Sequence, residues 1–382
     1  MKWLAVGYHR EVKKGDGNMK SKYYIAVLAS IVVALGTLLS ACGGETAQPT
    51  AAQPSVQPTV AQPAAQPTTA QPAAQPTTSQ ATPKKTVRVA LVLDGKIDDG
   101  GWNQAGYEGL MLAKQQYGVE TAYSEQVPIA DYEKALRDYA NQGYDLIIAH
   151  SSIAKDAVVN TAKDFPKLAF LWTDGDATSA NQAVIRPMSQ EASYLAGILA
   201  GKMTKSNVVG MVGGIDIPST HRSYAGFEQG LKEVNPNAKL LVNWIGSFLD
   251  VSKGKEAALS QIESGADVIF GNGDGQNIGV LQAAGEKNVL AIGAVRDQFQ
   301  VAPNVVLTSV QWGFSSGIAR VVGDVVQGKF KGQFYEIGLA QGADLAPYHD
   351  NASKIPDDVK KLIDDKRQGI LSGTIKVPVV DK

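Results

Sequence analysis

Apolar residues in the larger part of the chain come in short runs that are separated by amphipathic segments. The run at residues 86–94 is rich in β-branched residues and ends in an aspartate, and a helical pattern at 103–118 follows it. Gly118 predicts the end of this helix, because glycine readily takes the left-handed conformation that terminates helices. Further strands are expected at 120–123, 144–150 and 168–174, and further helices at 131–142 and 154–165. Strands that are apolar throughout are typical of a parallel sheet covered on both faces.

A second series of the same kind follows the first. We expect helices at 191–203, 224–234, 252–264 and 276–287, and strands at 207–214, 239–246, 266–273, 289–295 and 305–310. Two successive α/β halves predict an α/β protein with two Rossmann-like lobes, each built on a parallel sheet, and a cleft between them. Ligands of such sheets bind beyond the carboxyl ends of the strands, so residues that directly follow a strand are the candidates for a site.

The beginning of the chain has a different pattern. Two lysines precede an almost uninterrupted apolar run at residues 23–39, and small residues lead from it to Cys42, the one cysteine of the chain. These are the parts of a secretory signal peptide, with Met19 as the expected start. The Leu-Ser-Ala-Cys sequence resembles a bacterial lipobox. That resemblance implies removal of residues 1–41 and a lipidated Cys42 that anchors the chain to the extracytoplasmic side of the cell membrane. The alternative is an ordinary signal peptide or a membrane helix with an incidental cysteine.

Residues 42–85 predict a disordered tether. From residue 46 onward this segment repeats Gln, Pro, Thr and Ala and has almost no large apolar side chains, so it cannot bury enough surface to fold. A proline-rich chain of this kind tends to be extended. Folded sequence is therefore expected only over residues 86–382.

Composition and motifs exclude several classes of function. The formal net charge of -1 gives no basic surface for nucleic acid, and one cysteine with four scattered histidines argues against a metal centre. The segment at 323–330 has the Gly-x4-Gly-Lys skeleton of a phosphate loop, but Phe330 stands where Ser or Thr is needed, and the segment is expected to end a helix. Without a nucleophile motif, we expect a non-catalytic, monomeric protein that uses no cofactor.

The loop after the first expected strand places polar and aromatic side chains at the start of the next helix. Trp102 offers a flat apolar face for stacking, and Asn103 offers paired donor and acceptor groups. The alternative for Trp102 is a core residue packed under the loop.

From about residue 87 to its end, the chain resembles the Bmp/PnrA-like basic membrane lipoproteins, which are substrate-binding proteins of ABC transporters with a type I periplasmic-binding fold. At this helix start the family typically reads Asp-x-Ser-Phe-Asn-Gln-x-x-x-x-Gly, and here Asp99-Gly100-Gly101-Trp102-Asn103-Gln104 is followed by Gly109. Further matching segments are SYLAGILAG (193–201), VGGIDIP (212–218), GFEQGLKEVNP (226–236), GSFLDVSKGKEAA (246–258), GADVIF (265–270) and VLTSV (306–310). The resemblance implies a first lobe at about 86–187 and 311–333, and a second lobe at about 188–310 and 334–382, joined by a hinge.

The resemblance also implies a purine-type ligand, delivered to ABC permease and ATPase subunits. In that case Trp102 stacks on a base, Asn103 orients it, and Asp174 or Asp176 accepts hydrogen bonds from a ring edge. Asn272 and Asp274 would line the far lobe. The candidate ligand-binding residues are Asp99, Trp102, Asn103, Asp174, Asp176, Asn272, Asp274, Arg296, Asp297 and Trp312.

The chain departs from the family pattern at two positions. Ala294 stands where the family usually has an aspartate that would bind ribose, and Trp312 stands where it has a lysine. These changes favour a flat ligand, so we expect a free nucleobase to bind better than a nucleoside. Trp312 would form a second wall opposite Trp102. Arg296 or Asp297 could instead replace the missing groups. A flavin or another aromatic heterocycle is an alternative ligand. The rival interpretations are a surface nucleoside-processing enzyme and a ligand sensor for a membrane kinase.

Overall fold

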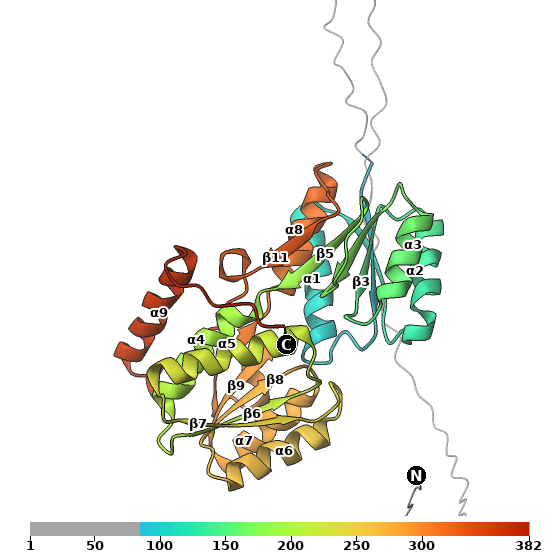
Figure 1. Cartoon of the computed structure of the whole chain (residues 1–382). Helices are drawn as coiled ribbons and strands as arrows, with labels where there is room; N and C mark the ends of the chain where they lie inside the picture. Colours follow the sequence, from blue (N-terminus) through green and yellow to red (C-terminus); the bar gives the residue numbers. More distant parts are fainter. Residues whose placement is uncertain (1–84, 382) are drawn as a thin grey trace, which may run out of the picture. The chain divides into compact units, whose positions relative to one another are not determined.

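The first lobe is built on a parallel sheet with strand order β11-β5-β4-β3-β1-β2 in a computed structural model that describes residues 85–381. The expected signal peptide, Cys42 and the tether up to residue 84 lie outside the described residues. The strands are β1 (Arg88–Leu93), β2 (Glu120–Ser124), β3 (Leu146–His150), β4 (Ala169–Thr173), β5 (Gln182–Pro187) and β11 (Phe334–Ile337). Helices α1 (Trp102–Tyr117) and α8 (Phe314–Val326) cover one face, and α2 (Tyr132–Asn141) and α3 (Lys155–Asp164) cover the other (Figure 1). Two covered faces explain why the central strands are apolar at every position.

The second lobe has a parallel sheet of its own, with strand order β10-β9-β8-β6-β7. Its strands are β6 (Val208–Gly213), β7 (Lys239–Trp244), β8 (Val268–Asn272), β9 (Leu290–Val295) and β10 (Val306–Gln311). Helices α4 (Ser189–Met203) and α5 (Pro218–Val234) lie on one side of this sheet and α6 (Val251–Glu263) and α7 (Gln276–Lys287) on the other (Figure 1), while α9 (Asp357–Leu371) packs on α4. The 3₁₀ helices of the described part are η1 (Ile129–Asp131), η2 (Phe299–Val301), η3 (Leu339–Gln341) and η4 (His349–Lys354).

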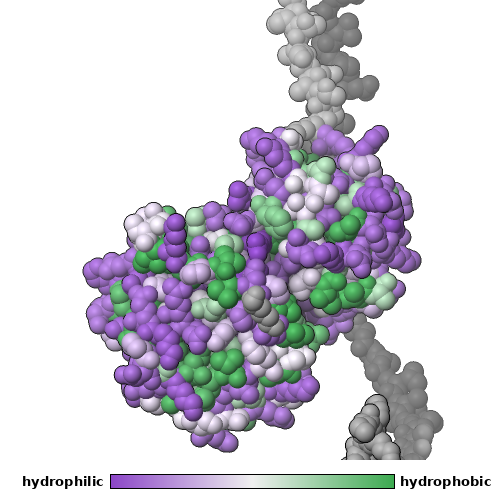
Figure 2. Space-filling model, viewed as in Figure 1, coloured by the Kyte–Doolittle hydropathy of each residue, from purple (hydrophilic) through white to green (hydrophobic). Residues whose placement is uncertain are grey.

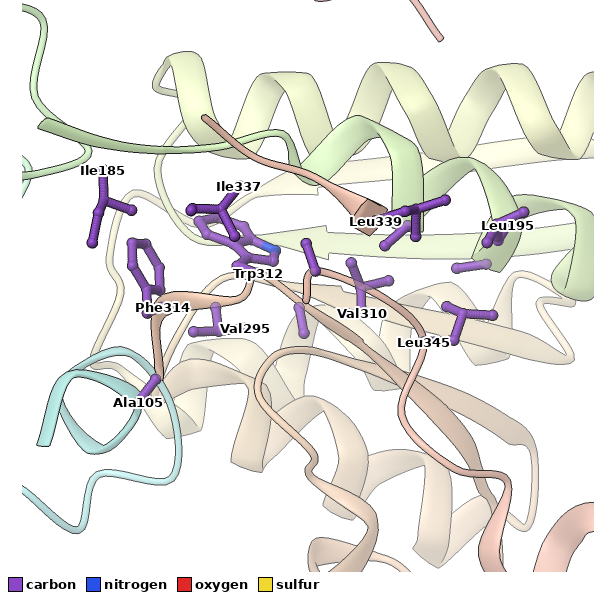
Figure 3. Close-up of a cluster of buried hydrophobic side chains, with 14 of the residues drawn as sticks. Ala105, Ile185, Leu195, Val295, Val310, Trp312, Phe314, Ile337, Leu339 and Leu345 are labelled. Carbon is purple, nitrogen blue, oxygen red and sulfur yellow. The ribbon is translucent and has the colours of Figure 1, made fainter. Parts of the chain in front are cut away.

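The chain passes from the first lobe to the second after β5 and after β11, and it returns after β10. A buried apolar cluster fills this crossing region, with Trp312, Phe314 and Ile337 beside one another (Figure 3). Gly313 turns the chain between the two aromatic residues with a φ of 75°. A side chain here would start 2.5 Å from the Ile337 Cγ2 atom, so the turn requires glycine.

The predicted fold class is confirmed, because both lobes have parallel sheets with helices on their faces. The segment at 323–330 spans the end of α8, as expected for a sequence that is no phosphate loop. One boundary was wrong: Phe334–Ile337 was assigned to the second lobe but pairs with β5 in the first sheet. This short edge strand alternates between exposed and buried residues, so it carries a weak sequence signal. Strand β5 was not predicted.

Candidate ligand site between the two lobes

A cavity of about 260 Å³ lies between the lobes at the carboxyl ends of their strands. Asp94 follows β1, Asp174 follows β4, Asp274 lies just after β8, and Trp312 follows β10. The lining residues are Asp94, Gly95, Trp102, Ile129, Ser152, Ile153 and Asp174 from the first lobe, and Ile217, Ser219, Thr220, Phe248, Leu249, Gly273, Asp274, Val295 and Trp312 from the second lobe and the return crossing. This cavity therefore lies where the carboxyl-end rule predicts a ligand site.

Trp102, the first residue of α1, lines this cavity and is held by His150 at the end of β3. Its ring lies over the imidazole with centroids 4.6 Å apart and an interplanar angle of 31°. Its Nε1 donates to the His150 carbonyl at 3.3 Å, and the His150 Nε2 lies 2.8 Å from the Trp102 carbonyl. Burial lowers the pKa of His150 to about 4, so the ring is neutral at physiological pH and Nε2 carries the proton that is donated. The indole is thus fixed in place while it faces the cavity.

Trp312 also lines the cavity, but it does not form a wall parallel to Trp102. The two ring centroids are 6.5 Å apart and the planes are at 89°. A planar ligand cannot stack face-to-face on both rings, so the expected second stacking wall was wrong. The orientation follows from packing, since Trp312 is 2% exposed and is tilted against Phe314. Its Nε1 is buried and has no hydrogen-bond partner among residues 85–381.

Apart from the two tryptophans, the polar side chains of the lining are three carboxyl groups and the hydroxyl groups of Ser152, Ser219 and Thr220. Burial raises the pKa of Asp94 above its usual value, and burial raises the pKa of Asp174 to about 6 although Arg222 opposes the change. Burial, reinforced by the neighbouring Asp99, raises the pKa of Asp274 well above its usual value. No Lys or Arg is among the described residues that line this cavity. Where these carboxyl groups are ionised they only accept hydrogen bonds, and they then suit a ligand that donates them.

Asp274 joins the second lobe to the start of α1 in the first. Its carboxylate accepts a hydrogen bond from the Trp102 backbone N–H at 2.5 Å. Asp99 accepts from the backbone N–H groups of Gly101, Asn103 and Gln104 at the same helix end. Carboxylates are favourable at this position because the first amides of a helix have no partners within it.

Two amide side chains that were predicted to bind ligand hold loops instead. Asn103 donates from Nδ2 to Asp99 at 2.9 Å and accepts from the Gly95 N–H at 3.2 Å. Asn272 is buried and donates to the Thr220 carbonyl at 2.9 Å. Neither side chain lines the cavity, and neither does Asp99, so all three support the site without reaching it in this structure.

The remaining predicted residues are engaged elsewhere. Asp176 is exposed and pairs with Lys155 at 2.6 Å. Arg296 pairs with Glu108 of α1 across the lobes at 2.8 Å, and Asp297 pairs with His349 at 2.6 Å. Ala294 is fully buried in β9 and does not line the cavity. Sequence inspection could not foresee these pairings, because the partners lie far apart along the chain.

Sequence inspection also missed several residues that line the site. Asp94 directly follows β1, and the rule that selected Asp174 could have selected it as well. The apolar lining residues Ile153 and Leu249 are isolated in loops and carried no signal. They are 65% and 64% exposed, which places them at the cavity mouth on opposite lobes. Hydrophobic residues are visible on the surface where the lobes face each other (Figure 2).

Comparison with known proteins places the chain in a family. Residues 86–381 match the family model of Bmp, the PnrA-like ABC transporter substrate-binding proteins. The chain is 33% identical to a CD4+ T-cell-stimulating antigen of Listeria monocytogenes over 77% of its length and 88% of the relative. It is 30% identical to a purine-binding protein of Brucella abortus, over 76% of this chain and 83% of the relative. An ABC transporter nucleoside-binding protein of Lactococcus lactis is 29% identical, over 77% of this chain and 90% of the relative.

A solved structure supports the same conclusion at the level of the fold. The ABC transporter solute-binding protein of Conexibacter woesei superposes with a TM-score of 0.65 at 25% identity and covers 78% of this chain and 100% of its own. The two parallel sheets and the cavity between them agree with that likeness. The chain therefore belongs to the Bmp family of PnrA-like substrate-binding proteins of ABC transporters.

Proposed function

We propose that this protein closes its two lobes over a purine-type ligand, with a free nucleobase preferred to a nucleoside, and delivers it to an ABC permease and its ATPase. The observation that carries the proposal is the acid-lined, tryptophan-containing cavity between the lobes. Purines offer a π-face for Trp102 and amino or ring N–H donors for the carboxylates of Asp94 and Asp174. The purine-binding relative of Brucella abortus supports the same ligand class.

The preference for a base rests on the absence of groups that would hold a sugar. Arg296 and Asp297 are already paired with Glu108 and His349, so they are not free to replace the carboxylate and ammonium that relatives have near the ribose. A ribose hydroxyl that is buried without a partner costs about 1–3 kcal/mol. The second candidate is a nucleoside, which the name of the Lactococcus lactis relative favours.

Calorimetric titration of the full-length protein, freed of bound small molecules by unfolding and refolding, tests this proposal. Adenine, guanine and hypoxanthine should each bind at least about ten-fold more tightly than the matching nucleoside. Riboflavin serves as an aromatic control of a different shape. Tighter binding of adenosine, guanosine or inosine than of any free base would refute the base preference. Tighter binding of riboflavin than of every purine would refute the ligand class.

The proposal includes an extracytoplasmic location, because substrate-binding proteins of ABC transporters work outside the cytoplasm. No helix within residues 85–381 is long and apolar enough to cross a membrane. We infer attachment through a lipidated Cys42, on the basis of the Leu-Ser-Ala-Cys sequence that follows the apolar run. A sensor role for the same domain would show itself as ligand-dependent contact with a membrane kinase in place of a permease.

A further inference from the structure

A buried ion pair connects the ligand cavity to the second lobe. Arg222 on α5 donates from its guanidinium to Asp174 Oδ1 at 3.1 Å, and the two side chains are 2% and 7% exposed. Asp174 follows β4 in the first lobe and lines the ligand cavity, whereas Arg222 is not among the residues that line it. The pair can form only while the two lobes are in contact.

Arg222 is itself held from its other side. Its second terminal nitrogen lies 3.3 Å from Asp381 near the end of the chain, and Asp381 accepts a hydrogen bond from Arg186 of β5 at 2.7 Å. These groups line a second cavity of about 350 Å³ that shares Ser152, Ile153, Asp174 and Ile217 with the ligand cavity. Lys155 and Asp176, which pair with each other, are its remaining charged residues. Asp174 therefore lies between the ligand cavity and an arginine whose position is fixed.

We propose that Arg222 is a positioning residue that determines ligand specificity, because it keeps Asp174 oriented and ionised as a hydrogen-bond acceptor for the ligand. This inference rests on the proposed function, in which the ligand occupies the cavity that Asp174 lines. An ionised carboxylate has about four acceptor positions. The hydrogen bond from Arg222 leaves acceptor positions for ligand N–H groups.

The electrostatics explain why the arginine is needed. Burial alone favours the neutral form of Asp174, and with Arg222 in place its pKa is about 6, which leaves most of the carboxyl groups ionised at neutral pH. An opposite charge at this distance lowers the pKa of an aspartate by about 1–3 units. Without Arg222, Asp174 would therefore be protonated near neutral pH and would present a donor to the ligand. Among the other neighbours, Arg186 lowers the pKa of Asp174 weakly, and Asp381 raises it.

The sign of the effect on stability can be tested without any ligand. The pKa of Asp174 is higher in the folded state than the ordinary value of 3.8, so the folded state binds this proton more tightly than the unfolded state. Its contribution to the free energy of unfolding therefore falls as the pH rises from about 4 to 6 and is constant above that range. In Arg222→Gln the fall should continue for about 1–3 pH units more.

Chemical denaturation of the full-length protein over a range of pH measures this difference. In Arg222→Gln the unfolding free energy should keep falling to a higher pH than in the wild type. The double variant Arg222→Gln with Asp174→Asn should lose this extra fall. Arg222→Lys keeps a positive charge and should restore most of the wild-type profile. Arg137→Gln, in a surface ion pair with Glu133 on α2, is the matched control. Because Arg137 lowers the pKa of Glu133, this variant can change the profile only at the acid end, and it should leave the profile above about pH 5 unchanged. An unchanged profile in Arg222→Gln would overturn the inference. Should that variant fail to fold, Asp174→Asn alone must make the wild-type fall between about pH 4 and 6 shallower, because the rest of the fall comes from Asp94 and Asp274. A fall as steep as that of the wild type would equally overturn the inference.

Titration with adenine between about pH 5.5 and 8.5 tests the consequence for binding. The wild-type affinity should decline below pH 6, and the affinity of Arg222→Gln should decline from a higher pH and be at least about ten-fold weaker at pH 7. A wild-type pH profile of binding in this variant would refute the role in specificity. If the wild-type protein binds no purine, the proposed ligand is wrong, and the measurements without ligand still decide whether Arg222 controls Asp174.

Discussion

At the scale of single residues, Trp102 contributes both recognition and rigidity. His150 supports its ring and bonds its backbone carbonyl, while Phe314 packs edge-on with centroids 4.5 Å apart. A side chain held in this way loses little further freedom when a ligand stacks on it. The perpendicular Trp312 contributes a wall of the cavity instead of a second stacking face.

Replacing Trp102 by alanine should weaken purine binding by about 1–3 kcal/mol, the range for base–aromatic stacking. Trp102→Phe keeps a ring in this place and serves as the control, with most of the affinity retained. Calorimetric titration with adenine measures both variants, and thermal unfolding checks that each is folded. An affinity of Trp102→Ala within about two-fold of wild type would show that the tryptophan is a core residue only.

At the scale of elements, the start of α1 is a point of contact between the lobes. Gly101 lies so close to the second lobe that a Cβ atom would start 1.9 Å from the Asp274 Oδ1 atom. Gln298 of the second lobe also donates to the Gly100 carbonyl at 3.0 Å. The absence of a side chain at this helix start therefore allows the closed arrangement.

Gly101→Ala should weaken adenine binding by about ten-fold or more while the thermal stability of the ligand-free protein changes little, because each lobe can fold without the close contact. Gly275→Ala is a matched control beside Asp274, since its Cβ atom would meet its nearest neighbour at 3.5 Å, an ordinary contact. Equal affinities of the two variants would contradict a role of Gly101 in closure. Small-angle scattering with and without adenine would show whether Gly101→Ala stays open.

The elements themselves could be predicted from the sequence to a large extent. Apolar runs marked the buried strands, and Gly118 ended α1 as expected, with a φ of 64°. The residues directly after strands led to Asp174, Asp274 and Trp312, because the carboxyl ends of parallel strands gather at one edge. The contacts across the lobes could not be predicted. Arg222 and Asp174 are separated by 48 positions, and no local pattern links them.

At the scale of the whole molecule, the two lobes depend on one another for the site. The cavity has walls from both, and the carboxyl groups of Asp94 and Asp174 from the first lobe and Asp274 from the second are among the groups that line it. Closure over a donor-rich ligand lets these buried groups make hydrogen bonds that they lack when the space is empty. Binding and closure are therefore expected to be coupled in this chain.

The folded part should be independent of the residues before it, and the position of β1 makes this testable. Lys85 is largely exposed and its pair with Asp145 is a surface contact, so a chain that starts at Thr86 should lose no more than about 1 kcal/mol of unfolding free energy. It should also bind adenine as the full-length protein does. A chain that starts at Leu91 is the control, because it lacks half of β1, which lies between β2 and β3 in the sheet, and it should not unfold cooperatively. Denaturation and calorimetric titration measure both properties. Loss of cooperative unfolding on removal of residues 1–85 alone would mean that the preceding segment is part of the folded structure, contrary to its lack of core-forming side chains.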